Sequence, residues 1–428
     1  MTDLASRLLG SGTVIVTPEV GTQLFGYRGR LAPARTVSSD LEANYLVFAE
    51  TSGQVRVLIS LDALYGGDLT EMVARSLSLP NEAVTVMGSH THYGAGIDSG
   101  ISSLGVTDLN YLAMATERLS DAIRPLLRRR SDNPSTPQVD EVAHSAMPVS
   151  GLFVSRRHRS FGVGLPLPRL GRVVSAPGPT TVDHTLHVVD IRRNGRTEAI
   201  LWGVGCHPVC FPDPLSISAC YPGYVREILR RRLGRSVPIL FAQGFSGDVR
   251  PKSSTRRPPP GAQAKLSWAA GGFRRFVDQT PGVYADWCAS LARTAEAALQ
   301  HACEDETPEV GVLRSSHYRA PSRPGWSRTP RICRLDFSEH ISLLLVNAEV
   351  VSSRIGDLHD RAPDRVVIPA GCCDRVFGYW PTDQMRQQGG YEGRTSVHHF
   401  PPVDWAVYGG PDRLWSILMD DVLPKKPS

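Results

Sequence analysis

The segment GSHTH at residues 88–92 carries the clearest chemistry in the sequence. It follows the apolar, β-branched run Ala83 to Met87, which predicts a buried strand. Successive strand side chains point to opposite faces, so we expect His90 and His92 to emerge on the same side of the strand end. Two imidazoles that face one site are suited to hold a metal ion or to move a proton.

His207 stands in a matching setting. It lies in GVGCHPVC, directly after the apolar run Ala199 to Val204. The next predicted strand, Val237 to Ala242, ends in FAQGFSGDVRP, where glycines allow the backbone to crowd a site. In that segment Asp248 has two open roles, because it can orient a ligand histidine or cap a turn. A second strand-end histidine site in the same chain indicates a metal.

The composition is that of a globular protein. The 428 residues are 41% apolar, which is enough to bury a large core. No signal-peptide pattern and no run of eighteen apolar residues occurs, so we expect a cytoplasmic protein without stable membrane insertion. The eight cysteines lack paired C-x-x-C spacing, which predicts reduced core thiols.

The net charge of +5 is spread along the chain, and nearly all basic residues are Arg. Arg clusters such as 128–130 and 230–232 fall at the ends of predicted helices, where cations interact favourably with the helix dipole. No stacking aromatics are interleaved with them, so we expect no nucleic-acid partner. The excess of Arg over Lys suggests a bacterial source. The sequence leaves open whether the protein forms a homo-oligomer.

Apolar runs and segments of helical period alternate along the chain. This alternation predicts an α/β fold with a mixed β-sheet core and flanking helices. We expect a single domain over residues 1–428, with loop excursions near 131–182 and 253–281, and no internal repeat is visible. The predicted strands are Thr13 to Val16, Tyr45 to Ala49, Val55 to Leu61, Ala83 to Met87, Thr185 to Ile191, Ala199 to Val204, Val237 to Ala242, Ser342 to Asn347 and Arg365 to Ile368, and the predicted helices are Asn110 to Leu127, Val225 to Leu233 and Tyr284 to Ala302.

The order of several short motifs resembles that of the neutral ceramidase family, including its shorter bacterial members. The opening VTPEVGTQLFGYRGR is similar to the family's start, and GSHTHYGAG is similar to its THTHSGPG element. SGLFVSRRHR resembles the family's N-R-containing loop, and GVGCHPV…ISACYPGY…FAQGFSGDVRP resembles its HP…S.DY.GY…Q…GDVSP block. NAEVV and GYWPTDQMRQQGGYEG resemble the late elements that supply a glutamate and two tyrosines. These matches run in the family's order from about residue 14 to residue 393.

The resemblance implies the fold of the neutral-ceramidase catalytic domain and a Zn²⁺ cofactor. It also implies cleavage of the amide bond of an N-acyl compound through a metal-activated water, with a small-molecule amide as the substrate. Nitrogen and oxygen ligands suit Zn²⁺. The implied metal ligands are His90, His207, Glu349 and Tyr379; the implied catalytic residues are His92, Arg156 and Tyr391; the expected substrate-binding residues are Arg250 and Tyr93.

Two positions depart from the family's pattern. Arg250 stands where GDVSP has a serine, and a guanidinium there would favour a carboxylate or a phosphate on the substrate. Cys220 stands where S.DY has an aspartate. Because the last motif lies close to residue 428, we expect a protein without the C-terminal β-sandwich of the secreted ceramidases.

The sequence is compatible with three functions. The favoured one is a zinc-dependent amidohydrolase. The first alternative is an enzyme of specialised metabolism that uses zinc for acyl transfer or for the formation of an amide or lactam, and the second is a non-catalytic binding protein with this fold. A serine hydrolase is disfavoured because the sequence has no G-x-S-x-G segment.

Overall fold

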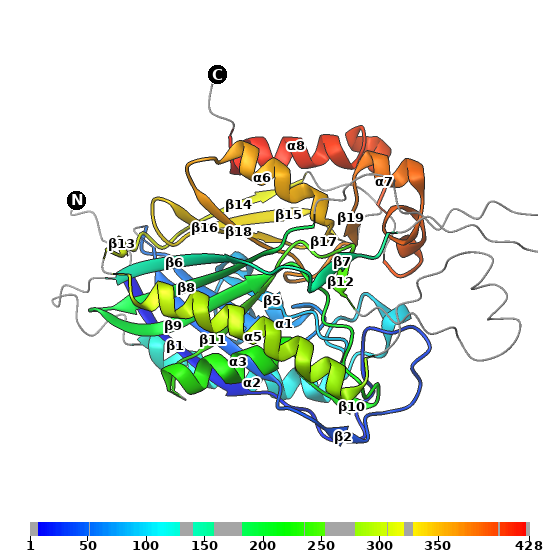
Figure 1. The fold of residues 1–428 in the computed structure, drawn as a ribbon, viewed down its shortest axis with the longest axis horizontal. Coiled ribbons are helices and arrows are strands. Elements are labelled where there is room, and N and C mark those ends of the chain that lie inside the picture. Colours follow the sequence, from blue (N-terminus) through cyan, green and yellow to red (C-terminus); the bar gives the residue numbers. More distant parts are fainter. Residues whose placement is uncertain are drawn as a thin grey trace, which may run out of the picture.

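Three β-sheets with the same strand order form the centre of the computed structural model (Figure 1). In each sheet three strands run antiparallel to their neighbours and a fourth strand lies parallel to the third. The structure describes residues 7–50, 52–128, 140–157, 182–234, 236–252, 279–305, 307–320, 328–400 and 403–424.

The strands of these sheets account for most of the β-structure in the described ranges. The first sheet contains β1 (Arg7–Ile15), β3 (Glu42–Ala49), β4 (Val55–Leu61) and β5 (Val84–Gly88). The second contains β6 (Asp140–Pro148), β8 (Thr185–Arg193), β9 (Arg196–Val204) and β11 (Ile239–Gln243), and β13 (Glu309–Val310) extends it beside β6. The third contains β14 (Arg314–Arg319), β15 (Arg331–Asp336), β16 (Ile341–Val346) and β18 (Val366–Ala370).

Helices connect and cover these sheets. A helix lies between the third and fourth strands of each sheet: α1 (Leu69–Ser76), α3 (Cys220–Leu233) and α6 (Ile355–Arg361). Longer helices follow the fourth strands: α2 (Leu109–Arg128), α5 (Pro281–Cys303) and α8 (Pro411–Val422). In Figure 1, α3 and α5 cross the second sheet, while α6 and α8 cover the third sheet at the top. Each sheet therefore has helices on its outer face.

The inner faces of all three sheets meet in one central core. Along β9, Leu201 joins this core, whereas its neighbours Ile200 and Trp202 pack outward against the cluster that contains α3 and α5. Strand side chains alternate between faces, so a strand buried on both sides needs a continuous apolar run. This explains why β4, β9 and β16 were recognisable from the sequence.

Local signals at the helix ends agree with the observed boundaries. Asp108 Oδ1 accepts a hydrogen bond from the Tyr111 N–H at the start of α2 (2.9 Å). The Thr280 hydroxyl accepts one from the Val283 N–H at the start of α5, where Pro281 occupies the first turn. Side chains that accept from these otherwise unpaired N–H groups fix where a helix begins.

Short strand pairs gather at one end of the sheets, on the right of Figure 1. β7 (Phe153–Ser155) pairs antiparallel with β12 (Val249–Pro251), and β17 (Glu349–Val350) pairs in parallel with β19 (Tyr379–Trp380). The remaining short elements are the parallel pair β2 (Thr36–Val37) and β10 (Ser216–Ile217), and helix α7 (Asp383–Gln388).

The α/β fold class with a mixed sheet core is confirmed. The segment near 131–182 contains two strands that the sequence did not predict, β6 and β7. The three sheets repeat one strand order, and this repeat is not visible in the sequence. Residues 129–139, 158–181 and 253–278 of the predicted excursions lie outside the described ranges.

None of the eight cysteines is joined in a disulfide, and all but Cys303 are buried. Among the described residues, the helices are too short or too polar to cross a bilayer.

Candidate metal centre and active site

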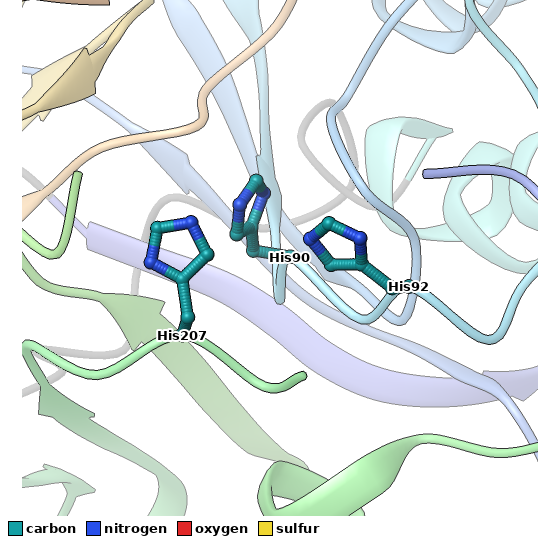
Figure 2. A group of neighbouring side chains, drawn as sticks. All are labelled: His90, His92 and His207. Carbon is teal, nitrogen blue, oxygen red and sulfur yellow. The ribbon is translucent and has the colours of Figure 1, made fainter. Parts of the chain in front are cut away.

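Three imidazoles converge at the end of the sheets where β5 and β9 finish (Figure 2). His90 and His92 follow β5, and His207 follows β9. The His90 ring centroid lies 5.0 Å from that of His92 and 4.7 Å from that of His207. One ring nitrogen of each residue lies within 4.8 Å of the others. Ligand sites in α/β folds form at the carboxyl ends of parallel strands, and β5 and β9 each belong to a parallel pair.

Backbone carbonyls fix the orientation of all three rings. The Nδ1 atom of each ring lies within hydrogen-bond distance of a carbonyl oxygen, so Nδ1 carries the proton and Nε2 presents its lone pair. The partners are the Leu64 carbonyl for His90 (3.0 Å), the Gly26 carbonyl for His92 (2.9 Å), and the Ser246 and Val249 carbonyls for His207 (2.7 and 3.0 Å).

Glu349 brings a carboxylate to the same point from the third sheet. It follows β16 by three residues, and its Oε2 atom lies 3.6 Å from His90 Nε2 and 3.3 Å from His207 Nε2. The other oxygen, Oε1, accepts a hydrogen bond from the Tyr65 hydroxyl (2.5 Å). Each of the three sheets thus contributes at least one ligand candidate from the end of a strand in its parallel pair.

These atoms fit a bound cation. His90 Nε2, His92 Nε2 and Glu349 Oε2 are buried and have no hydrogen-bond partner among the described residues. Lone pairs and a carboxylate oxygen that face one another at this range repel unless a positive charge lies between them, and a buried polar atom without a partner is costly. Imidazole nitrogens and a carboxylate oxygen are ligands that Zn²⁺ accepts.

The protonation states of His92, His207 and Glu349 agree with a site that binds a metal ion. Burial lowers the pKa of His207 to about 4. Burial, with the neighbouring His90 and His207, holds the pKa of His92 well below its usual value. Burial alone would raise the pKa of Glu349, but His90 and His207 outweigh it and hold this pKa well below its usual value. Neutral imidazole and ionised carboxylate are the forms that bind metals.

Tyr379 lies beside Glu349 because β17 and β19 pair in register, with Glu349 opposite Tyr379. Its hydroxyl accepts a hydrogen bond from Arg156 Nη2 (3.0 Å). Burial and the charge of Glu349 raise the pKa of the Tyr379 phenol well above its usual value. The structure therefore brings Tyr379 to the site. Its role as a metal ligand stays a prediction.

Arg156 is held rigidly at the same cavity. Its Nε atom donates to Glu392 Oε1 (2.8 Å), and its Nη2 atom also donates to the Gly247 carbonyl (2.8 Å). The Tyr391 ring centroid lies 5.0 Å from the guanidinium carbon, within the range of a cation–π contact. The hydrogen bonds of Arg156 to described residues use Nε and Nη2, so Nη1 is available to a ligand.

The remaining predicted residues line the same cavity of about 390 Å³. Arg250 comes from β12, and its Nη2 atom lies 3.4 Å from Cys210 Sγ. Tyr93 is buried, and its hydroxyl donates to the Val209 and Phe211 carbonyls (3.0 and 3.2 Å). Tyr93 therefore offers the cavity its ring.

His90 and His92 do not converge through the alternation of side chains along a strand, so that prediction was wrong. β5 ends at Gly88, and His90 has a positive φ of 65°, so the two histidines leave a turn and do not alternate along a strand. The Asp248 carboxylate accepts hydrogen bonds from the Ser155 hydroxyl and from the Ser352 N–H, so it links β7 to the segment that follows β17.

Sequence reasoning missed Tyr65 and Glu392. Tyr65 lies four residues after β4, at the same edge of the sheets as the histidines. Glu392 is buried beside Tyr391 and binds both Arg156 and Arg157. A buried carboxylate between two guanidiniums is stable only as part of such a network. The available signal for Glu392 was its place inside the GYEG segment, next to a predicted catalytic residue.

Gly247 confirms that glycines allow close backbone approach here. A Cβ atom at this position would lie 2.9 Å from the Val350 carbonyl oxygen and 3.0 Å from that of Glu349. The loop that carries Asp248 therefore packs directly on the strand that carries Glu349.

Two solved structures that resemble this protein are ceramidases. Neutral ceramidase from Pseudomonas aeruginosa matches over 100% of this chain and 76% of its own, with a TM-score of 0.69 and 15% identity. A ceramidase structure described as complexed with C2 matches over 100% of this chain and 77% of its own, with a TM-score of 0.67 and 14% identity. The sequence matches no family model, and it matches no curated protein. The resemblance drawn from the motifs is thus confirmed at the level of the fold.

We expect Gly26→Ala to impair His92 selectively. Gly26 has φ of 108°, and a Cβ atom there would lie 2.7 Å from His92 Nδ1, so the ring must move from the carbonyl that orients it. If His92 moves protons during catalysis, kcat falls by about 10²-fold. Gly21→Ala is the matched control, because Gly21 has φ of 99° with no atom within 4 Å of its Cβ position. Equal kcat values for the two variants would contradict this role of His92.

Proposed function

We propose that this protein is a zinc-dependent amidohydrolase that cleaves the carbon–nitrogen bond of an N-acyl compound. The observation that carries the proposal is the convergence of His90 Nε2 and His207 Nε2 on Glu349 Oε2, at 3.6 and 3.3 Å. In the described part of the chain, His90 Nε2 and Glu349 Oε2 are buried without a hydrogen-bond partner. Two histidines and one glutamate are the protein ligands of several zinc hydrolases. The ceramidase fold of the matching structures supports the same reaction class.

In this proposal Zn²⁺ is held by His90, His207 and Glu349, with Tyr379 as the fourth ligand. When bound, the ion polarises a substrate carbonyl and activates water at neutral pH. Tyr65 orients Glu349 through its short hydrogen bond to Oε1. Such outer contacts fix ligand geometry and raise metal affinity.

The remaining residues bind and protonate the substrate. Arg156 offers Nη1 to the carbonyl oxygen, where negative charge develops during acyl transfer, and Glu392 keeps the guanidinium in place. Tyr391 packs on the same guanidinium and adds a hydroxyl near the carbonyl. His92 accepts a proton from the attacking water on Nε2 and passes it to the leaving amine, while the Gly26 carbonyl holds its Nδ1 proton.

Hydrolysis of a substrate panel with and without metal tests the proposal. The panel contains N-acyl amino acids, N-acyl sphingoid bases and small amide metabolites. We expect the zinc-loaded protein to release the acid and the amine, a chelator to stop the release, and added zinc to restore it. Full activity in the metal-free protein would contradict the proposal. An amide that accumulates from an ester and an amine would identify acyl transfer, and no reaction with any member of the panel would favour a binding protein.

A further inference from the structure

A row of aromatic rings leads away from the metal centre along one side of the cavity. The Tyr27 ring centroid lies 4.7 Å from that of His92, and the Tyr93 centroid lies 6.3 Å from that of Tyr27. Phe211 continues the row, because its ring contacts that of Tyr93 edge-on with 5.4 Å between the centroids. Tyr27, Tyr93 and Phe211 all line the cavity of about 390 Å³, and together they form an aromatic wall.

The aromatic wall offers apolar ring surface to a ligand, because its hydroxyl hydrogens are already used. The Tyr27 hydroxyl donates to the Val209 carbonyl (3.1 Å). The Tyr93 hydroxyl donates to the Val209 and Phe211 carbonyls (3.0 and 3.2 Å). A phenol has one hydrogen to donate, so neither tyrosine keeps a donor for a ligand. The wall therefore favours apolar groups, which gain free energy when they leave water.

The row of rings ends at Phe211, in a rigid part of the chain. Pro212 and Pro214 follow it closely, and their rings fix the backbone φ angle. Beyond Tyr93, the Phe211 ring contacts Tyr284 of α5 edge-on, with 5.5 Å between the centroids. Tyr284 is buried in the core cluster that contains α5. Phe211 is thus held between the wall and the core, and a ligand that follows the wall meets a fixed ring.

His92 decides which part of the substrate lies on the aromatic wall. In the proposed reaction, His92 Nε2 passes a proton to the leaving amine, so the amine nitrogen lies beside this imidazole. Tyr27, the first ring of the wall, packs against the same imidazole. A substituent on the amine nitrogen therefore extends along the wall toward Phe211.

We propose that the aromatic wall binds an apolar substituent on the amine side of the substrate, and that Phe211 limits the length of this substituent. The inference rests on the proposed amidohydrolase function and narrows its substrates to amides of apolar amines. The cavity volume of about 390 Å³ agrees with a length limit, because it lies near the lower end of the range for small-molecule sites. A rigid wall selects by size, since each methylene that is buried adds affinity and one that meets a fixed ring adds none.

Two series of neutral amides test the inference with the zinc-loaded protein. N-alkylacetamides lengthen the amine side, and N-methylalkanamides lengthen the acyl side by the same steps. In the first series kcat/KM should rise by about fourfold for each methylene and stop rising where the chain meets Phe211. Phe211→Ala should move this plateau to longer chains, and Phe211→Trp should move it to shorter ones. Neither variant should change the profile of the second series.

Val283→Ala is the control, because it removes an exposed apolar side chain of α5, and it should leave both profiles unchanged. A general loss of stability in a Phe211 variant would lower all values of a series together without moving the plateau. A plateau of the N-alkylacetamides that stays in place in both Phe211 variants would overturn the inference. A plateau that moves in the acyl series instead would also overturn it.

Calorimetric binding of the N-alkylacetamides separates this inference from the proposed function. Hydrolysis with a plateau that ignores Phe211 would leave the amidohydrolase standing and remove the selectivity of the aromatic wall. A binding plateau that moves with Phe211, without any hydrolysis, would refute the amidohydrolase and retain the wall as an apolar binding site.

Discussion

Glu349→Gln is expected to abolish tight zinc binding. The substitution keeps the size of the side chain and removes the charge that faces His90 and His207 at 3.6 and 3.3 Å. Loss of an outer partner of a metal ligand costs 10- to 100-fold in affinity, so loss of the ligand charge should exceed about 100-fold. Zinc content after dialysis, measured by elemental analysis, should fall from about one ion per chain to near zero.

Thermal unfolding gives a second measure of the same change. At a zinc concentration of about 100 Kd, binding stabilises the native protein by about 2.7 kcal/mol, so Tm rises with added zinc. Glu349→Gln should show no such rise. Glu309→Gln is the control, because Glu309 lies on β13 at the edge of the second sheet and pairs with His340. If Glu349→Gln retains one zinc ion and the wild-type rise in Tm, the proposed ligand set is wrong.

Arg156→Gln is expected to lower kcat by about 10²- to 10³-fold, which is the effect of removing one donor to a developing oxyanion. Zinc content should stay near one ion per chain. The hydrogen bonds of Arg156 to described residues go to Glu392, to the Gly247 carbonyl and to Tyr379, and so leave the histidines and Glu349 in place. Glu392 keeps its ion pair with Arg157, so the fold should persist.

Steady-state kinetics on the best substrate of the panel provide the measurement. Arg156→Lys retains the charge without the planar set of donors and should recover part of kcat. A value of kcat for Arg156→Gln within about threefold of wild type would remove Arg156 from the catalytic residues.

The sequence predicted the parts of the fold that are buried on both faces. β4, β9 and β16 are predominantly apolar, as in VRVLISL and ISLLLV, because one face joins the central core and the other packs under helices. β14 and β15 escaped prediction because charged residues interrupt them, as in RSSHYR and RICRLD. The repeated strand order could not be predicted from the sequence either, because the residues at the strand ends differ. Histidine follows β5 and β9, whereas glutamate follows β16.

The site was predictable where chemistry is encoded within short motifs. All nine residues assigned from the motifs lie at or around one cavity, although the roles of the individual residues stay predictions. The supporting contacts were not predictable, because they join residues far apart in the chain. Tyr65 and Glu349 are separated by 284 positions, and Arg156 and Glu392 by 236. Only the three-dimensional structure brings such pairs together.

The position of the metal is the most direct test of the central claim. A crystal of the zinc-loaded protein, measured on both sides of the zinc absorption edge, locates the ion without reference to the protein density. We expect one anomalous peak at coordination distance from His90 Nε2, His207 Nε2 and a carboxylate oxygen of Glu349, at about 2.0–2.2 Å. An intact structure with no peak between these three side chains, or with its zinc bound elsewhere, would contradict the account.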